Sequence, residues 1–371
     1  MVRTEADRCP GVLAVHEAAD GGLARVRVPG GVLSVEQLDV LRRAASELGD
    51  GQLELTSRGN VQVRALTADG PRELSERLYD AGLLPSITHE RVRNILASPL
   101  SGLDGQSRYD VLPLVSAVDA GLCARPRLAE LPGRFLFALD DGRGDLSGVQ
   151  ADVLVRAIDE CEAFLSLGGG LGARVSWADV ADVMVATAAA FLDERQGQEW
   201  RVAELEDGEN RILDRIGLRA TEDLPAATMT IEAGWHGESA LVVTVPLGSL
   251  GQEQAAAIAD VADEIRITPW RSLVLRVETD PSERLERVGL VTKPDSPWNG
   301  VTACAGQPGC AKALADVRAD ARRVTPRLPQ HGRPMHWSGC ERRCGKPSGE
   351  FVDVLALGNG YSIDGERTGL R

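Results

Sequence analysis

Two segments that lie far apart in the chain share one order of hydrophobic and polar positions. In the first segment, apolar and polar residues alternate over residues 24–28, a helical pattern begins at Ser34, and alternation returns over residues 53–63. Alternation with a period of two predicts a strand, and apolar spacing of three to four residues predicts a helix. The order strand, turn, helix, strand then recurs over residues 240–248, 251–264 and 265–276.

The two segments also share individual residues at one constant offset. The matched pairs are Pro29 with Pro246, Gly31 with Gly248, Gln37 with Gln254, and Glu47 with Glu264, and Thr56 realigns with Thr268 after a short deletion. A repeat of this kind predicts two copies of one α+β half-domain, paired about a pseudo-two-fold axis. We expect this pairing to bring the loops after Thr56 and Thr268 towards a common cleft.

The rest of the chain contains weaker patterns. An alternating apolar run after Gly133 predicts a strand that ends in a turn, and residues 180–192 are rich in Ala and Val at helical spacing. Residues 196–208 are polar and predict a surface connection. Short strand-like runs over residues 351–356 precede a Gly-Asn-Gly turn. The glycine run at residues 168–172 lacks the Gly-x-Gly-x-x-Gly pattern of a nicotinamide site, so we interpret it as a turn.

Charge and hydropathy narrow the class of protein. No stretch approaches the roughly 20 apolar residues that cross a bilayer, so no membrane association is expected. The first eight residues carry acids where a signal peptide needs a basic region, which predicts a cytoplasmic protein. The net charge of −14 disfavours a nucleic-acid partner because it repels polyphosphate.

Four of the seven cysteines gather near the carboxyl end, as Cys304-x5-Cys310 and Cys340-x3-Cys344. Four thiolates complete the ligand set of an iron–sulfur cluster, and their softness favours iron–sulfur or zinc over magnesium or calcium. Structural zinc sites usually use Cys-x2-Cys pairs, so the wider gaps favour a four-iron four-sulfur cluster, with zinc as the alternative. The isolated cysteines are expected to be structural: Cys9, Cys123 and Cys161.

The cysteine spacing on a duplicated α+β chain resembles the sulfite and nitrite reductase superfamily, and within it the precorrin-3B synthase family of aerobic cobalamin biosynthesis. Seven motifs carry the resemblance: Arg8-Cys-Pro-Gly, Leu55-Thr-Ser-Arg-Gly-Asn-Val-Gln, Arg93-Asn-Ile-Leu-Ala-Ser-Pro-Leu-Ser-Gly, Leu139-Asp-Asp-Gly, Arg266-Ile-Thr-Pro-Trp-Arg, Ala303-Cys-Ala-Gly-Gln-Pro-Gly-Cys and Ser338-Gly-Cys-Glu-Arg-Arg-Cys. They span nearly the whole chain.

The resemblance implies an α+β fold of two ferredoxin-like half-domains with an added α/β domain and a cluster-binding part. We accordingly expect a first half-domain over residues 10–80, a middle α/β domain over 85–225, a second half-domain over 228–285, and a 4Fe-4S cluster-binding segment over 290–371. The cluster ligands would be Cys304, Cys310, Cys340 and Cys344.

In the reductases of the superfamily, two arginines and two lysines hold an anion over sirohaem. Motif by motif, the arginines fall on Arg58 and Arg93, and the lysines on Arg134 and Leu136. Leu136 offers neither a proton nor a charge, which argues against reduction of sulfite or nitrite. With Arg271 on the matching loop of the second copy, the arginines Arg58, Arg93 and Arg134 suit the carboxylates of a tetrapyrrole. The alternative is that these arginines pair with acids of the chain itself.

The resemblance to precorrin-3B synthase implies an oxygen-dependent hydroxylation of precorrin-3A at a meso carbon, with formation of a lactone. Electrons would come through the cluster from an external donor, either a ferredoxin or an NAD(P)H-dependent reductase. The family adds a non-haem iron, whose ligands the sequence leaves unassigned. The five imidazoles are His16, His89, His236, His331 and His336, and His336, although close to Cys340, is more typical of a packing residue.

Two other functions fit parts of the pattern. The first is a sirohaem-dependent sulfite or nitrite reductase. Arg343, directly before the last cysteine, argues against permanently bound sirohaem, because its bulk either meets the macrocycle or binds a substrate carboxylate. The second is a non-catalytic electron carrier or a zinc-stabilised binding module. Absorption and spin-resonance spectra distinguish all three.

Overall fold

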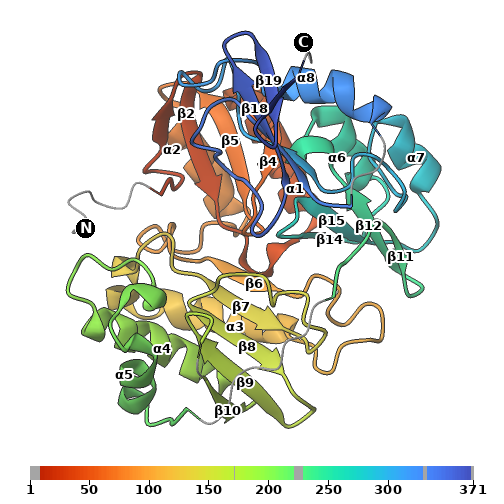
Figure 1. Ribbon diagram of the computed structural model, residues 1–371. Coiled ribbons are helices and arrows are strands. Elements are labelled where there is room, and N and C mark those ends of the chain that lie inside the picture. The colour runs from red at the N-terminus through yellow and green to blue at the C-terminus, as the bar shows by residue number, and fades with distance from the viewer. Residues whose placement is uncertain (1–8, 171, 221–228, 329–331, 369–371) are drawn as a thin grey trace.

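The computed structural model describes residues 9–170, 172–220, 229–328 and 332–368 (Figure 1). Two residues singled out above, Arg8 and His331, lie outside these ranges, as does the acidic start of the chain. Among the helices of the described residues, none has the length and apolar character needed to cross a membrane.

The two repeated segments form two sheets of the same strand order. The first sheet contains β1 (His16–Ala18), β2 (Gly21–Val26), β5 (Val61–Leu66) and β4 (Leu53–Leu55), with α1 (Val35–Leu48) and α2 (Gly70–Asp80). The second contains β11 (Gly234–His236), β12 (Ala240–Thr244), β15 (Ser272–Arg276) and β14 (Glu264–Ile267), with α6 (Gln252–Ala259) and α7 (Ser282–Arg287). All these strand pairs are antiparallel.

Each sheet is completed by a fifth strand from the other copy. The two-residue strand β3 (Val32–Leu33) of the first copy pairs with β14, and β13 (Ser249–Leu250) of the second pairs with β4. Short 3₁₀ turns precede these strands, η1 (Pro29–Gly31) and η4 (Pro246–Gly248). The exchange is reciprocal, and one hydrophobic core runs through both halves. The predicted pseudo-two-fold pair of ferredoxin-like half-domains is therefore confirmed.

The second strand predicted in each copy is in fact a hairpin. Residues 53–63 break into β4 and β5 at a turn in which the Thr56 N–H donates to the Asn60 carbonyl at 2.9 Å. In the second copy the Thr268 N–H donates to the Ser272 carbonyl at 3.0 Å. Both threonine hydroxyls also accept bonds from backbone N–H groups inside their turns, so the same residue organises both turns.

Helix α1 begins at the capping box predicted from Ser34 and Gln37. The Gln37 N–H donates to Ser34 Oγ at 3.2 Å, and the Ser34 N–H donates to Gln37 Oε1 at 3.1 Å. The helix buries Leu38, Leu41 and Leu48 against the shared core.

The middle part of the chain folds as a separate α/β unit with its own core (Figure 1). Its sheet has the order β10-β9-β8-β7-β6, and β6, β7 and β8 are parallel. The elements are β6 (Ile95–Ala97), β7 (Phe137–Asp140), β8 (Val153–Ala157), β9 (Glu162–Leu167), β10 (Gly172–Ser176), α3 (Leu112–Cys123), α4 (Val180–Glu194), α5 (Gly208–Arg215), η2 (Pro126–Glu130) and η3 (Val202–Glu204). The strand after Gly133 and the Ala-rich helix match their predictions.

The C-terminal part forms a fourth sheet over a third core. The order is β16-β17-β18-β19-β20, and β16, β17 and β18 are parallel. The elements are β16 (Val301–Ala303), β17 (Met335–Ser338), β18 (Val352–Leu357), β19 (Gly360–Ile363), β20 (Glu366–Thr368), α8 (Val317–Val324) and η5 (Thr325–Arg327). Leu247 of the second half-domain belongs to this core, so the C-terminal sheet is packed onto the paired half-domains.

Candidate functional site

The four clustered cysteines follow two neighbouring parallel strands. Cys304 comes directly after β16, and Cys340 comes two residues after β17. The register pairs Ala303 with Trp337, so both strands end at one edge of the sheet. Cys310 and Cys344 lie in the turns that follow. Because the carboxyl ends of parallel strands share an edge, the fold brings both halves of the cysteine pattern to one place.

The four thiols share one electrostatic environment. Partial burial raises the pKa of the Cys344 thiol, Arg342 opposes this, and the negative charges of Cys304, Cys340 and Cys310 raise it further. The Gly339 N–H donates to Cys304 Sγ at 3.1 Å, a bond that stabilises thiolate charge. All four cysteines are free of disulfides.

The sulfurs of the four cysteines are less closely packed than the ligands of a bound zinc ion. In the part of the chain that the structure describes, the single group of three or more candidate ligand atoms within 4.8 Å of one another consists of aspartates, and no three of these sulfurs meet that closely. Tetrahedral zinc, with Zn–S bonds of about 2.3 Å, draws its sulfurs to about 3.8 Å. A zinc ion held by all four cysteines would therefore need the sulfurs to move closer together, and the choice of an iron–sulfur cluster stays a prediction.

Glycines make room for the cysteine loops. Gly306 has φ +68°, and a Cβ there would lie 2.8 Å from Val317 Cγ2. A Cβ on Gly339 would lie 2.7 Å from the Cβ of Ala313. Contacts under 3.0 Å are not tolerated by Cβ atoms without a shift, so both loops depend on the missing side chain.

Three arginines tie the cysteine loops to other parts of the molecule. Each donates to a backbone carbonyl at or beside a cysteine: Arg64 to Gly309 at 2.8 Å, Arg318 to Cys304 at 3.1 Å, and Arg271 to Gly345 at 2.8 Å. Arg64 lies on β5 of the first half-domain, and Arg271 lies in the β14–β15 turn of the second. The loops are thus attached to both half-domains.

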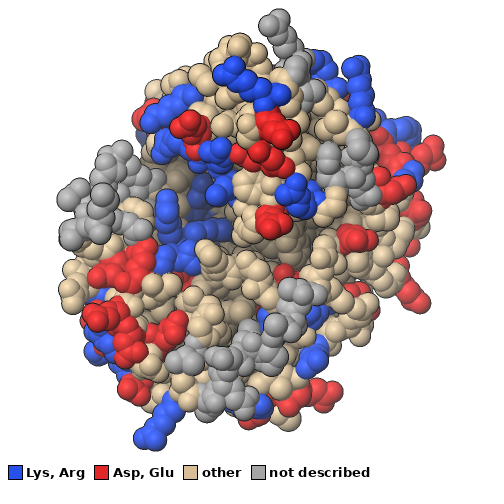
Figure 2. All heavy atoms as spheres, in the orientation of Figure 1, with Lys and Arg blue, Asp and Glu red and all other residues tan. Residues whose placement is uncertain are grey.

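A basic hollow lies between the half-domains and the middle domain. Figure 2 shows Lys and Arg atoms gathered on its wall, near the elements that Figure 1 labels β2 and β5. Burial lowers the pKa of Arg58 to about 10, with further lowering by Arg201 and Arg25 and opposition from Cys9. Burial likewise lowers the pKa of Arg27 to about 10, and Arg25 and Arg58 contribute. These four guanidiniums form one cluster of positive charge.

The predicted arginines have different surroundings. Arg58 donates to the Gly133 carbonyl at 3.4 Å, and among the described carboxylates none forms an ion pair with it. Arg134, beside Gly133, is exposed, with its Cζ 5.1 Å from the ring centroid of Trp200. Arg271, in the second turn, likewise has no ion pair with a described carboxylate. A Cβ on Gly59 would lie 3.3 Å from the Ile267 carbonyl oxygen, so the two turns approach each other as expected.

Arg93 does not join this set. Its guanidinium forms a fork with Asp119, from Nε and Nη2 at 2.7 Å each, and Nη1 donates to the Leu83 carbonyl at 3.0 Å. Arg93 is buried against α3. This pairing matches the alternative that the sequence left open, and ligand binding by Arg93 stays a prediction.

Arg343 and His336 also have partners within the protein. Arg343 Nε lies 2.8 Å from Asp353 Oδ2, so its guanidinium has a carboxylate partner within the protein. The buried His336 shares a hydrogen bond of 2.8 Å with the Thr302 hydroxyl. Burial lowers the pKa of His336 to about 4, and Arg271 adds to this effect. The imidazole is therefore neutral at pH 7.

Sequence reasoning missed part of the basic cluster. Arg25 and Arg27 lie two residues apart along β2 and its end, a spacing that places both on one face of a strand and that could have identified them. Both donate to Cys9 Sγ, at 3.3 and 3.4 Å, so Cys9 lies in the cluster instead of in a core. Arg201 lies far along the chain from Arg25, Arg27 and Arg58, and no local pattern indicates that it joins them.

Comparison with known proteins supports this description. Residues 16–81 match the family model of the nitrite/sulfite reductase ferredoxin-like half domain. A precorrin-3B synthase of Sinorhizobium sp is 27% identical over 98% of this chain and 83% of its own length. A ferredoxin–nitrite reductase of Synechococcus elongatus is 25% identical over 93% of this chain and 77% of its own. The structure of Mycobacterium tuberculosis NirA shares the fold, with a TM-score of 0.74 and 21% identity over 92% of this chain and 74% of that one.

Proposed function

We propose that the chain is a member of the nitrite and sulfite reductase superfamily and, within it, an oxygen-dependent mono-oxygenase that converts precorrin-3A into precorrin-3B. The reaction hydroxylates a meso carbon and closes a lactone with a neighbouring acetate. One oxygen atom of O2 enters the product and the other leaves as water, which takes two electrons and two protons from an external ferredoxin or NAD(P)H-dependent reductase. The relatives are oxidoreductases, and the synthase matches nearly the full chain.

The observation that carries this proposal is that the basic hollow lacks the second cation of a reductase. Leu136, at the position of the second lysine, is 3% exposed, and its N–H donates to Asp152 Oδ2 at 2.9 Å. The Leu136 side chain offers no proton and no charge to a ligand in the basic hollow. Arg58 and Arg271, which have no described carboxylate partner, are placed for a ligand that brings its own carboxylates.

The cysteines fit a four-iron four-sulfur cluster in number, softness and spacing. We propose Cys304, Cys310, Cys340 and Cys344 as its ligands. When bound, such a cluster transfers single electrons. The Gly339 N–H stabilises the charge on Cys304, and Arg271 links the turn of the second half-domain to the loop of Cys344. A tetrapyrrole carboxylate on Arg271 would therefore be held beside the cluster loop.

Each proposed arginine has a distinct task in substrate binding. Arg58 and Arg134 flank Gly133 at the middle domain and grip carboxylates on one side of the macrocycle, and Arg271 grips one on the other. A guanidinium binds a carboxylate through two parallel N–H bonds, which fixes orientation as well as position. The macrocycle then presents one edge to the cluster loop.

An additional non-haem iron does not find a matching ligand set. Of the described histidines, none belongs to a group of three candidate ligands within 4.8 Å of one another. Such irons commonly take two histidines and one carboxylate. We therefore assign no step to this iron.

Spectra and turnover of anaerobically purified full-length protein test the proposal. We expect cluster absorption, no sirohaem band, and oxygen consumption that depends on precorrin-3A. Tightly bound sirohaem together with sulfite or nitrite reduction would overturn the proposal and favour the reductase. Zinc without iron, with activity unchanged in Cys304→Ser, would favour a binding module.

Matched variants test the site within the same protein. Arg58→Ala should weaken precorrin-3A binding by roughly 10- to 100-fold, since a hydrogen bond to a charged group contributes about 1.5–3 kcal/mol. Arg72→Ala, on an 87% exposed side chain of α2, is the control and should bind normally. Equal binding by both variants would remove Arg58 from the site.

A further inference from the structure

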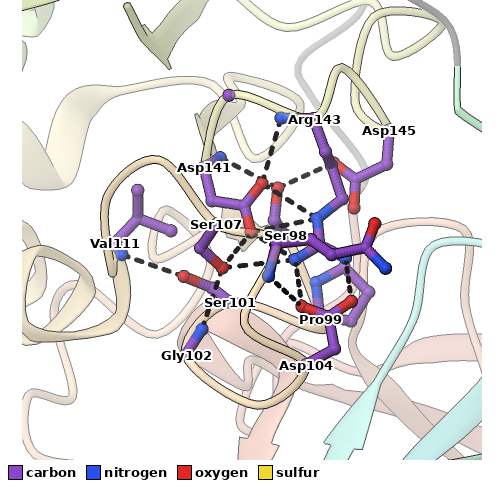
Figure 3. A network of polar contacts seen from close by, with 12 residues as sticks. Ser98, Pro99, Ser101, Gly102, Asp104, Ser107, Val111, Asp141, Arg143 and Asp145 are labelled. Atoms are coloured by element: carbon purple, nitrogen blue, oxygen red, sulfur yellow. Dashed lines mark hydrogen bonds and ion pairs between the residues drawn. The ribbon is translucent and has the colours of Figure 1, made fainter. Parts of the chain in front are cut away.

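A compact group of aspartates lies at the carboxyl edge of the middle sheet, apart from the cysteines. Asp140 ends β7, Asp141 follows it, and Asp145 lies in the same loop, while Ser98 directly follows the neighbouring parallel strand β6. One carboxylate oxygen from each of the three aspartates lies within 4.8 Å of the other two, and all three residues are buried. Figure 3 shows how Ser98, Asp141 and Asp145 gather there.

The group has too little positive charge around it. Arg143 bonds Asp141 and Asp104, at 2.7 and 2.8 Å, and Arg156 Nε lies 3.3 Å from Asp140 Oδ2. The side chains of Asp104, Asp140, Asp141, Arg143 and Arg156 are at most 6% exposed, and Asp145 as a whole residue is 6% exposed. When all four aspartates are ionised, these two arginines leave two negative charges uncompensated among the described residues. Buried charges of this kind are paired, bound to a metal or neutralised by a proton.

One oxygen of the group has no partner. Asp145 Oδ1 accepts a hydrogen bond from Ser98 Oγ at 2.7 Å. Asp145 Oδ2 is inaccessible to solvent and has no hydrogen-bond partner among the described residues. By contrast, Asp140 Oδ1 accepts hydrogen bonds from the N–H groups of Gly142 and Gly144. Asp145 Oδ2 is therefore a buried acceptor to which the described residues supply neither a donor nor a cation.

We propose that Asp140, Asp141 and Asp145 bind one hard divalent cation of the Mg²⁺, Ca²⁺ or Mn²⁺ class. Carboxylate oxygens are the donors that these ions prefer, and the group contains no sulfur or imidazole that would select a softer metal. The ion would neutralise the two excess charges and give Asp145 Oδ2 its ligand. The site is separate from the cysteines and does not depend on the function proposed above.

The position of the site gives the cation a structural role. The loop after β6 is held by the second half-domain, because Arg266 of β14 donates to the carbonyls of Pro99 and Ser101 at 3.0 and 2.6 Å. A Cβ on Gly237 would lie 3.0 Å from Asp104 Cα, so the same loop also touches the β11–β12 turn. A cation bound here would brace the loop after β7, which the Ser98–Asp145 hydrogen bond connects to the loop after β6 where the middle domain meets the second half-domain.

A proton is the competing occupant. Burial raises the pKa of Asp145 to about 7, Asp140 raises it further, and the bond from Ser98 opposes the change. A protonated Asp145 would remove one of the two excess charges without any metal. Metal binding must therefore be measured directly.

Titration with MnCl₂ alone tests the proposal on chelator-treated full-length protein with its iron cluster intact. Loss of the free-ion spin-resonance signal should reveal one saturable Mn²⁺ site per chain, and Asp145→Asn should weaken it at least tenfold. Glu76→Gln, an exposed acid on α2, is the control and should bind Mn²⁺ like the natural chain. The absence of saturable binding at millimolar Mn²⁺, or equal binding by Asp145→Asn, would overturn the proposal.

Hydrogen exchange on the natural chain provides a test that needs no variant. Mn²⁺ should slow exchange in peptides that cover residues 98–104 and 140–147, while peptides of α2 and β1 stay unchanged. Protection confined to other regions, or no protection at saturating Mn²⁺, would contradict the assigned site even if the Asp145 variant failed to fold.

Discussion

Replacing Asp119 by alanine is expected to destabilise the protein by about 3–5 kcal/mol, the cost of removing one partner of a buried ion pair. The side chains of Arg93 and Asp119 are 5% and 16% exposed and form a two-bond fork. Without the carboxylate, the guanidinium keeps the Leu83 carbonyl, which carries no full charge. A buried cation is then left largely uncompensated.

The thermal midpoint is the suitable measurement, with iron per chain recorded in parallel. A loss of this size should lower the midpoint of the middle domain by roughly 10 °C. The double variant Arg93→Met with Asp119→Leu should recover a large part of the loss, since an apolar pair of similar volume removes both buried charges. Cluster content and precorrin-3A affinity of the folded protein should stay unchanged.

The opposite pattern would refute the assignment of Arg93 to structure. If Asp119→Ala shifted the midpoint by less than about 2 °C and precorrin-3A binding fell in Arg93→Met, Arg93 would be a ligand-binding residue after all. Arg58→Ala provides the reference for that pattern, because it should lose affinity with little change in stability. The two arginines therefore separate ligand binding from packing in one set of measurements.

Three smaller changes test other parts of the structure. Gly339→Ala should lower the iron content per chain, because its Cβ would lie 2.7 Å from that of Ala313, whereas Gly358→Ala meets nothing within 4 Å and should match the natural chain. Ser34→Ala should lower the free energy of unfolding by about 1 kcal/mol in a denaturant titration followed by circular dichroism. An unchanged free energy of unfolding would show that the capping box does not stabilise the protein. Arg64→Met, which loses the bond to a cysteine-loop carbonyl, should speed the decay of cluster absorption in air, and an unchanged decay rate would contradict that role.

The duplication could be predicted because equivalent positions in the two copies are under the same backbone constraints. Gly31 and Gly248 both have left-handed φ, at 72° and 66°, and a Cβ on Gly31 would lie 2.2 Å from the Ile267 carbonyl oxygen. Thr56 and Thr268 hold equivalent turns with their hydroxyls. Such constraints preserve residue identity at fixed positions, so the sequence alone reveals them.

The exchanged strands could not be predicted, because β3 and β13 have two residues each and two residues show no periodicity. The separation of Arg93 from Arg58 was equally hidden. Arg58 and Arg93 both follow strand-like or turn-like motifs, so the local pattern does not distinguish them. Only the fold places Asp119 of α3 opposite Arg93. A sequence identifies charges well, but the partner of each charge depends on contacts between remote segments.

The cysteine site illustrates how the local pattern and the remote contacts combine. The x5 and x3 gaps indicate which sulfurs belong together, and the two parallel strands explain why they meet. Arg64 and Arg271 each bind a carbonyl of these loops, one from each half-domain, at 2.8 Å. A cluster on these cysteines is thereby connected to the half-domain turns that carry Arg58 and Arg271. Because Arg271 donates to the Gly345 carbonyl in the loop of Cys344, a substrate carboxylate bound to Arg271, as proposed above, would be held beside the loop that carries a cluster ligand.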